Sequence, residues 1–278
     1  MESGPMIDLH SHTTASDGQY SPTELVSLAH RAGVTHLAVT DHDTLAGLAE
    51  ATNAARSIGL ALIPGIEISA FIEEKEVHIL GHFISEANPG LAQLIAAARI
   101  ERRARMEQMI GKLNALGLPV TLEQVLTIAD QAQLGRPHLA RALVEQRLCG
   151  SVKEAFDRFL GSGRPAFVDR IRLASQKAID AIREAGGSAT LAHPATSRVT
   201  GQEIEGLASA GLSGLEVFRV DHTPSQRTKY LELSHELNLV PTAGSDFHGE
   251  KVAPDRALGS VSMVESSLEA LQRRASAG

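Results

Sequence analysis

The chain has 278 residues, with 26 basic and 33 acidic side chains and a formal net charge of −7. This acidic balance argues against a basic surface that coats long nucleic acid, so we expect no binding to long DNA. The single cysteine, Cys149, excludes an intramolecular disulfide and a thiol-rich zinc site. Neither an apolar membrane span nor a charged leader with an apolar run is recognisable, so we expect a cytoplasmic protein with no membrane contact.

Hydrophobic residues make up 43% of the chain and aromatic residues only 3%. An aliphatic core of this kind favours parallel strands covered by helices over a β-sandwich. The length fits one large domain or a domain with a sizeable insertion.

The first motif that carries chemistry is the stretch IDLHSH at residues 7–12. His10 and His12 come two residues apart, so their side chains leave an extended strand from the same face. Two imidazoles at a strand end can bind one metal ion, although an isolated His-x-His is equally often ordinary. A turn-rich loop with Asp17 follows, and a capped helix is expected over residues 21–31.

The next strand, over residues 35–40, ends in Asp41-His42-Asp43. A carboxylate beside an imidazole can orient it for a metal, so we expect Asp41 to orient His42 through its second nitrogen. An alanine-rich helix over residues 45–58 then continues the strand–helix rhythm of a parallel sheet or barrel.

The third strand, over residues 60–69, contains Glu67 between two isoleucines. A carboxylate in such an apolar run is costly unless it is paired or metal-bound, which favours a ligand. The fourth strand, over residues 76–83, carries His78 and His82 on one side, and we expect one of these two to be ordinary.

From about residue 88 the rhythm gives way to helical segments, and we interpret residues 88–165 as a helical insertion or cap. Arg136 and His138 stand at a helix start, where backbone N–H groups favour anions, and Arg164 lies on a glycine-rich loop. Any one of these side chains alone would be an ordinary solvated residue. Together they predict a phosphate-binding surface.

The strand–helix rhythm returns after residue 166, with strands at residues 188–192, 214–218 and 239–244. Arg219 and His222 follow the second of these strands and are interpreted either as substrate contacts or as plain surface residues. The carboxyl ends of the strands in such folds converge on one face, so polar residues at strand ends should meet there. Imidazoles and carboxylates without thiols suit Zn, Mn or Fe. The residues expected to meet are His10, His12, Asp17, Asp41, His42, Glu67, His78, His193, Asp246 and His248.

The chain resembles the polymerase-and-histidinol-phosphatase (PHP) family of metal-dependent phosphoesterases. The resemblance is carried, in the family's order, by IDLHSHTTASDG, VTDHDT, GIEIS, VHILG, AHP and GSDFH. It implies an α/β fold, a distorted (β/α)7 barrel, with two to three divalent metals at the strand ends. The barrel would comprise residues 1–87 and 166–278, with the helical cap between them.

The resemblance also implies which residues hold each metal. One metal would be held by His10, His12, Glu67 and Asp246. A second would be held by Glu67, His78 and His193, and a third by Asp17, His42 and His248. Manganese is the expected metal, with iron or zinc as alternatives.

Many members of the family have a histidine where this chain has Asp17. The aspartate resembles the branch that acts on nucleotides, and GRPHLA resembles the substrate-binding segment of that branch, with Arg136 and His138 in it. The resemblance thus implies hydrolysis of the 3′-phosphate of 3′,5′-bisphosphate nucleotides, such as adenosine 3′,5′-bisphosphate to AMP, by a metal-bridging hydroxide. Stepwise 5′→3′ removal of nucleotides from short RNA is a related activity of that branch.

Two alternatives remain open at this point. One is a small-molecule phosphatase of the histidinol-phosphatase type, against which Asp17 and the arginine-bearing cap argue. The other is a non-catalytic metal-binding PHP domain, against which the complete set of expected ligands argues. No general acid for the leaving alcohol and no oligomeric state follow from the sequence.

Overall fold

The computed structural model describes residues 4–130 and 132–275. The chain divides into two compact units. The first unit comprises Met1–Leu94 and Arg172–Gly278, and the second unit comprises Ile95–Ile171.

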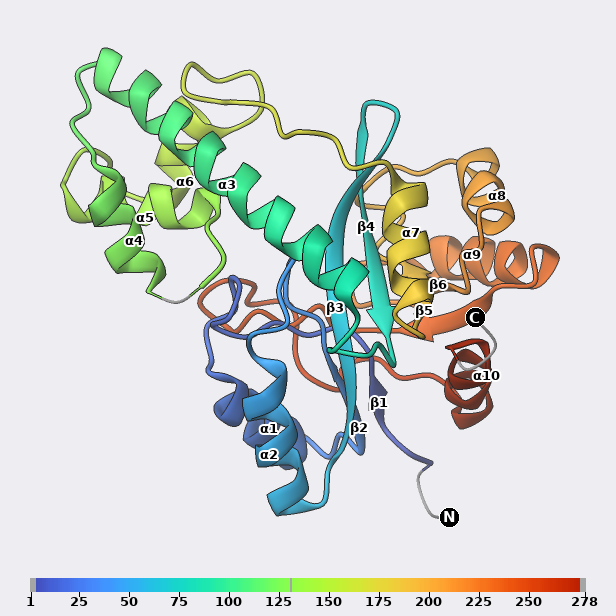
Figure 1. Cartoon of the computed structure of the whole chain (residues 1–278). Helices are drawn as coiled ribbons and strands as arrows, with labels where there is room; N and C mark the ends of the chain where they lie inside the picture. The colour runs from blue at the N-terminus through green and yellow to red at the C-terminus, as the bar shows by residue number, and fades with distance from the viewer. Residues whose placement is uncertain (1–3, 131, 276–278) are drawn as a thin grey trace. The chain divides into compact units, whose positions relative to one another are not determined.

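A curled sheet of seven strands forms the centre of the first unit, with the strands in sequence order from β1 to β7 (Figure 1). Leu9 N donates to Ala243 O at 3.0 Å and Asp246 N donates to His10 O at 2.8 Å. These bonds connect the chain after β1 to the chain at and after β7, so the sheet is a nearly closed barrel, and the expected α/β barrel is confirmed. The strands are β1 (Ile7–Asp8), β2 (His36–Val39), β3 (Ala61–Ile72), β4 (Lys75–His82), β5 (Ser188–Leu191), β6 (Gly214–Phe218) and β7 (Val240–Ala243).

The barrel is not uniformly parallel, because β4 runs antiparallel to both of its neighbours, β3 and β5. Only Glu73 and Glu74 separate β3 from β4, and a connection this short can form a hairpin but not a parallel crossover. The hairpin register places His78 opposite Ser69, two residues from Glu67 along β3. The antiparallel strand therefore brings His78 close to Glu67.

Aliphatic residues on both faces of the strands form the core of the first unit. Leu37 and Val39 of β2 belong to one apolar cluster, whereas Ala38 between them belongs to another. Because both faces of β2 are buried, its sequence is a continuous apolar run. Helices of the first unit surround the strands (Figure 1). They are α1 (Pro22–Arg31), α2 (Leu48–Ile58), α7 (Ser175–Glu184), α8 (Gly201–Ser209), α9 (Pro224–Glu236) and α10 (Glu265–Ala275).

The second unit is helical and has an apolar core of its own, which includes Met109, Leu113, Val125 and Leu139. Most of the long helix α3 belongs to this unit, as the helical pattern after residue 88 predicts. The elements are α3 (Pro89–Ala115), α4 (Leu122–Ala129), α5 (Arg136–Glu145), α6 (Val152–Ala155) and the π-helical turn η1 (Phe156–Leu160).

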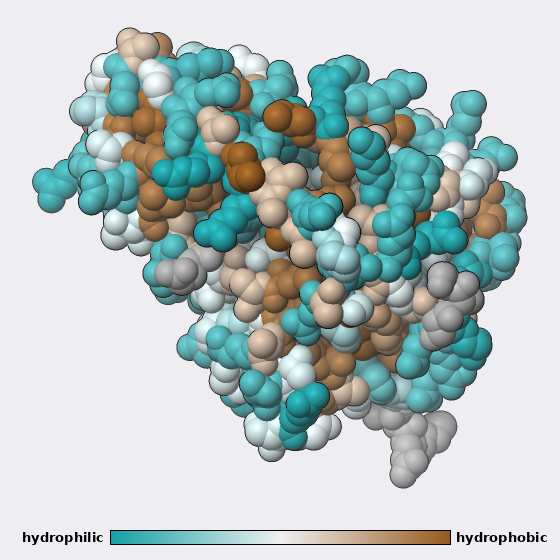
Figure 2. All heavy atoms as spheres, in the orientation of Figure 1, coloured by the Kyte–Doolittle hydropathy of each residue, from teal (hydrophilic) through white to brown (hydrophobic). Residues whose placement is uncertain are grey.

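The surface mixes hydrophilic and apolar residues on the face drawn in Figure 2. Exposed large apolar side chains include Ile100 and Ile171 of the second unit. Among the described residues, no helix combines the length and the apolar character that crossing a membrane requires.

Truncating a core leucine of the second unit should destabilise the protein. Leu113 is fully buried, so Leu113→Ala should lower the free energy of unfolding by about 2–5 kcal/mol through lost burial and a residual cavity. Urea denaturation followed by circular dichroism measures the loss. The matched control is Leu116→Ala, because Leu116 is 49% exposed and its truncation should change stability by no more than about 0.5 kcal/mol. Equal losses in the two variants would contradict this account of the core.

Candidate metal centre

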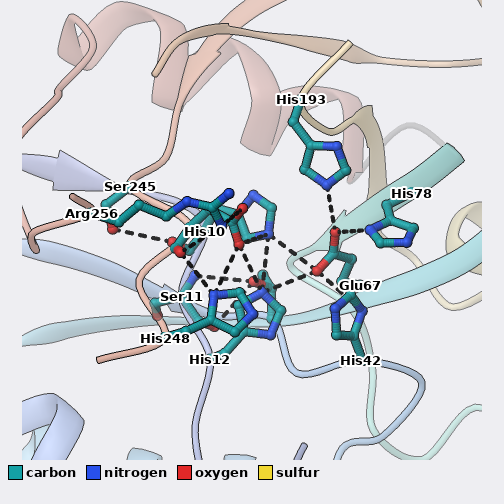
Figure 3. A network of polar contacts seen from close by, with 12 residues as sticks. His10, Ser11, His12, His42, Glu67, His78, His193, Ser245, His248 and Arg256 are labelled. Carbon is teal, nitrogen blue, oxygen red and sulfur yellow. Dashed lines mark hydrogen bonds and ion pairs between the residues drawn. The ribbon is translucent and has the colours of Figure 1, made fainter. Parts of the chain in front are cut away.

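Histidines and carboxylates from several barrel strands converge on one network of polar contacts (Figure 3). His10 and His12 follow β1, His42 follows β2, and Glu67 lies within β3. Asp17 lies in the loop between β1 and α1, and the remaining side chains come from β4 or follow β5 and β7. The structure connects every side chain predicted as a metal ligand to at least one other, namely His10, His12, Asp17, His42, Glu67, His78, His193, Asp246 and His248.

Glu67 lies at the centre of the network, and its side chain is only 1% exposed. Burial raises the pKa of this carboxyl, but the surrounding histidines outweigh burial and hold the pKa well below its usual range. Both carboxylate oxygens are therefore available to bind cations. Oε2 lies 3.2 Å from His10 Nε2, 3.0 Å from His12 Nε2 and 3.3 Å from His42 Nδ1, and Oε1 lies 2.7 Å from His78 Nδ1 and 3.1 Å from His193 Nε2.

Three groups of these side chains bring their ligand atoms within 4.8 Å of one another, as binding of one metal ion requires. Glu67 belongs to two of the groups, so its two oxygens can bridge neighbouring ions. His193 is outside the three groups, but it approaches the same Glu67 oxygen as His78 does. The groups are His10, His12, Glu67 and Asp246; then His42, Glu67 and His78; and then His12, Asp17, His42 and His248.

The network has the chemistry that a divalent cation needs. The buried Nδ1 atoms of His12 and His42 approach carboxylate oxygens of Asp17 and Glu67 but make no hydrogen bond with any described residue. The Nε2 atoms of His10 and His12 lie only 3.2 Å apart. Nitrogen and oxygen ligands crowded in this way fit Mn, Fe or Zn, because the cation satisfies lone pairs that would otherwise repel.

Electrostatic effects in the network oppose one another strongly. Burial disfavours charge on His10, but the surrounding carboxylates, Asp246 first among them, raise the pKa of His10 to about 10. His78 beside Glu67 has its pKa raised to about 9 despite burial. Burial instead dominates at His42 and lowers its pKa to about 3. The carboxylates thus require protons or cations beside them, and metal binding would displace the protons.

Asp246 divides its two oxygens between different partners. Oδ1 lies 3.3 Å from both His10 Nε2 and His12 Nε2, whereas Oδ2 accepts from Arg219 at 3.2 Å and from Arg256. The two arginines therefore leave one oxygen directed at the imidazoles. A pocket beside the network is lined by Asp17, His248, Val252, Ala253, Asp255 and Arg256.

Asp41 has a different role from the expected one. Its carboxylate accepts hydrogen bonds from Thr13 N at 2.8 Å, Thr13 Oγ1 at 2.7 Å and Ser16 Oγ at 2.6 Å. These partners lie in the loop that carries Asp17. The expectation that Asp41 orients His42 is therefore wrong, because the carboxylate instead holds the Asp17 loop against β2.

The surface interpretation of Arg219 and His222 is also wrong, because Arg219 is 0% and His222 3% exposed. Arg219 donates to both carboxylate oxygens of Asp221 at 2.8 Å, and His222 Nδ1 donates to Val217 O at 3.0 Å. His82, on β4, donates from Nε2 to a backbone carbonyl and belongs to none of the three groups, as expected for one of the two histidines of that strand.

Sequence reasoning missed Glu216, which lies in β6 and is fully buried. It contacts His10 Nδ1 at 2.9 Å. Burial raises the pKa of Glu216, but Arg219 and His10 outweigh burial and lower it to about 2. The signal was present in the sequence, since Glu216 stands between Leu215 and Val217 just as Glu67 stands between two isoleucines.

The basic candidates of the second unit have defined surroundings within that unit. Arg136 begins α5, and its guanidinium carbon lies 5.8 Å from the ring centre of Phe156 and 5.6 Å from that of Phe167. His138 is buried, and its Nδ1 accepts from Gly135 N at 3.1 Å. Arg164 is exposed.

Comparisons with known proteins agree with this geometry. A solved structure from Bifidobacterium adolescentis, assigned as a metal-dependent phosphoesterase, is 30% identical with a TM-score of 0.88 and covers 99% of this chain and 97% of that one. A Chromobacterium violaceum amidohydrolase structure is 31% identical with a TM-score of 0.84 and covers 96% of both chains.

Curated relatives match over similar lengths. A 5′-3′ exoribonuclease of Haemophilus influenzae is 38% identical over 87% of this chain and 89% of its own. A 3′,5′-nucleoside bisphosphate phosphatase of Chromobacterium violaceum is 34% identical over 87% of both chains. The model of the PHP domain matches residues 8–185. From these matches, together with the converging histidines and carboxylates, the chain belongs to the PHP family.

Proposed function

We propose that this protein is a metal-dependent hydrolase of phosphate esters, and that its substrates are 3′,5′-bisphosphate nucleotides and short 5′-phosphorylated RNA. The single observation that carries the proposal is the buried Glu67, whose two oxygens meet histidines from different strands. The relatives named as an exoribonuclease and as a nucleoside bisphosphate phosphatase support the substrate class.

The metal ligands are proposed to be His10, His12, Asp17, His42, Glu67, His78, His193, Asp246 and His248. Two or three divalent ions, with manganese first and iron or zinc as alternatives, would leave the site positive, because only three of these ligands are carboxylates. When bound, such ions lower the pKa of a coordinated water and neutralise phosphate oxygens. The chain contributes the arrangement, with Glu67 able to span two ions and Asp246 limited to one oxygen by its arginines.

Residues 88–165 are proposed as the cap that carries phosphate-binding groups, with Arg136, His138 and Arg164 among them. His138 is buried, and because its Nδ1 accepts from Gly135 N, the neutral ring carries its proton on Nε2. Arg136 stands at the start of α5, where the helix dipole adds to its positive charge.

The two alternatives are less well supported. Two curated relatives are named as an exoribonuclease and as a nucleoside bisphosphate phosphatase, and a further relative from Eggerthella lenta, 33% identical over 87% of this chain, is a phosphoribosyl 1,2-cyclic phosphate 1,2-diphosphodiesterase. None of these names favours a histidinol phosphatase. The convergence of the predicted ligands on one network argues against a non-catalytic domain.

Manganese-loaded protein should release phosphate from adenosine 3′,5′-bisphosphate and leave 5′-AMP. Chromatography of the products and a phosphate assay measure the reaction, and short 5′-phosphorylated RNA should yield 5′-mononucleotides. Protein that holds its metals by elemental analysis but releases neither product would contradict the proposed substrate class.

Glu67→Gln should remove the bridging carboxylate while keeping the size of the side chain. The expected results are loss of metal and a fall in kcat of about 1,000-fold or more, because an amide is a much poorer bridging ligand. Elemental analysis and steady-state kinetics measure the two effects, with circular dichroism as a test of folding. Glu107→Gln is the control, since Glu107 pairs with Arg103 on exposed surface and should behave as wild type. Wild-type metal content and turnover in Glu67→Gln would refute the assignment.

Arg136→Ala should weaken recognition of a second phosphate. One lost charge-assisted hydrogen bond predicts a rise in KM of about 10–100-fold for adenosine 3′,5′-bisphosphate. The KM for p-nitrophenyl phosphate should change less than threefold, or about 0.6 kcal/mol, because this substrate has only one phosphate and lacks the second phosphate that Arg136 would contact. Arg141→Ala, an exposed arginine on the same helix, is the control. Equal changes for both substrates would argue against this role.

A further inference from the structure

Glu216 is a buried carboxylate that belongs to none of the three candidate metal-binding groups. Its oxygens meet three donors. Oε1 accepts from His10 Nδ1 at 2.9 Å, and Oε2 accepts from His193 N at 2.7 Å and from Arg219 Nη1 at 3.2 Å. One carboxylate of β6 therefore contacts two candidate ligands that follow different strands, β1 and β5.

The contact with His10 decides which nitrogen of that ring carries the proton. The Glu216 carboxylate can only accept, so His10 Nδ1 must donate. On the neutral ring that a metal would bind, the opposite nitrogen, Nε2, presents its lone pair to the side where Glu67 lies at 3.2 Å and Asp246 at 3.3 Å. A carboxylate behind a metal-binding histidine fixes both the tautomer and the orientation of the ring.

The contact with His193 fixes a backbone that is otherwise unfavourable. His193 has a φ of 29°, in the left-handed region that few non-glycine residues adopt. The Glu216 oxygen accepts the N–H of this residue, while His193 Nε2 lies 3.1 Å from Glu67. The carboxylate thus holds the turn that directs His193 toward the centre of the network.

The neighbourhood of Glu216 is closely packed and internally paired. A Cβ at Gly244 would lie 2.3 Å from His10 Cβ and 2.5 Å from Glu216 Oε1, so only glycine allows this approach. The fully buried Arg219 connects Glu216 to Asp246, to which its Nη2 donates at 3.2 Å. The guanidinium thereby holds a candidate ligand of the chain after β7 in register with those that follow β1 and β5.

We propose that Glu216 is a positioning residue for the metal centre, which sets the proton of His10 on Nδ1 and orients His10 and His193, with Arg219 as its buried counter-ion. This inference rests on the proposed metal-dependent function. It assigns Glu216 no contact with substrate.

Glu216→Gln in the full chain tests the proposal, because an amide offers one acceptor oxygen to three donors. Calorimetric titration of metal-stripped protein with Zn²⁺ should show the affinity of the tightest site falling about 10–100-fold. In the zinc-loaded wild type, ¹H–¹⁵N spectra should show a slowly exchanging proton on His10 Nδ1, and its resonance should move or vanish in the variant. Assignment by His10→Gln identifies the resonance.

Asp221→Asn is the matched control, since it removes a carboxylate from Arg219 without touching His10 or His193. The zinc affinity of Asp221→Asn should stay within about threefold of wild type. Mutating a carboxylate that is hydrogen-bonded to a metal ligand typically lowers metal affinity about 10–100-fold. If Glu216→Gln does not fold by circular dichroism, Glu216→Asp carries the test, because it keeps the charge but cannot reach all three donors.

The possible outcomes distinguish a failure of this inference from a failure of the proposed function. Wild type that binds no metal would overturn the proposed function and the inference together. Wild type that binds zinc with the same affinity as the folded Glu216 variant would overturn the inference alone. Equal losses in the Glu216 and Asp221 variants would also overturn it, because they would assign the effect to the charge around Arg219.

Discussion

The buried carboxylate of Glu67 is the constraint on which the site depends. An ionised carboxylate in an apolar strand costs several kcal/mol unless partners compensate for its lost hydration. Here the compensation comes from histidines that arrive from other strands, so the charge is tolerable only once the barrel has brought those strands together. The antiparallel β4 is part of that requirement, since its register places His78 beside the same carboxylate.

The two units differ in the types of side chain that cluster in them. The first unit gathers imidazoles and carboxylates at strand ends, where short loops hold them. The second unit gathers arginines against aromatic rings, with Arg105 and Arg136 both near the ring of Phe167. The first set of side chains suits cations, and the proposed phosphate-binding role of Arg136 would give the second unit an affinity for anions.

Local patterns were sufficient to predict the barrel strands and most of the residues that converge on the network, although not Glu216, because strand ends and apolar runs are recognisable in short stretches of sequence. Partners across the fold were not predictable in this way. Asp41 was assigned to its sequence neighbour His42, but it bonds Thr13 and Ser16 across the β1–β2 pair. Arg219 follows a strand as a surface residue would, and Glu216 and Asp221 are near it in sequence, but its contact with Asp246 forms only in the folded barrel. Hairpin geometry likewise decided the direction of β4.

The barrel closes where the chain after β1 is hydrogen-bonded to the chain at and after β7, and this closure, called the seam below, affects how the protein folds. The bonds between the chain after β1 and the chain around β7 connect residues more than two hundred positions apart, and His10 and Asp246 both lie on that seam. Because a ribosome makes the chain from its N-terminal side, His10 is synthesised well before Asp246. The polar network therefore cannot assemble before β7 and the residues after it have been made and have paired with the chain after β1.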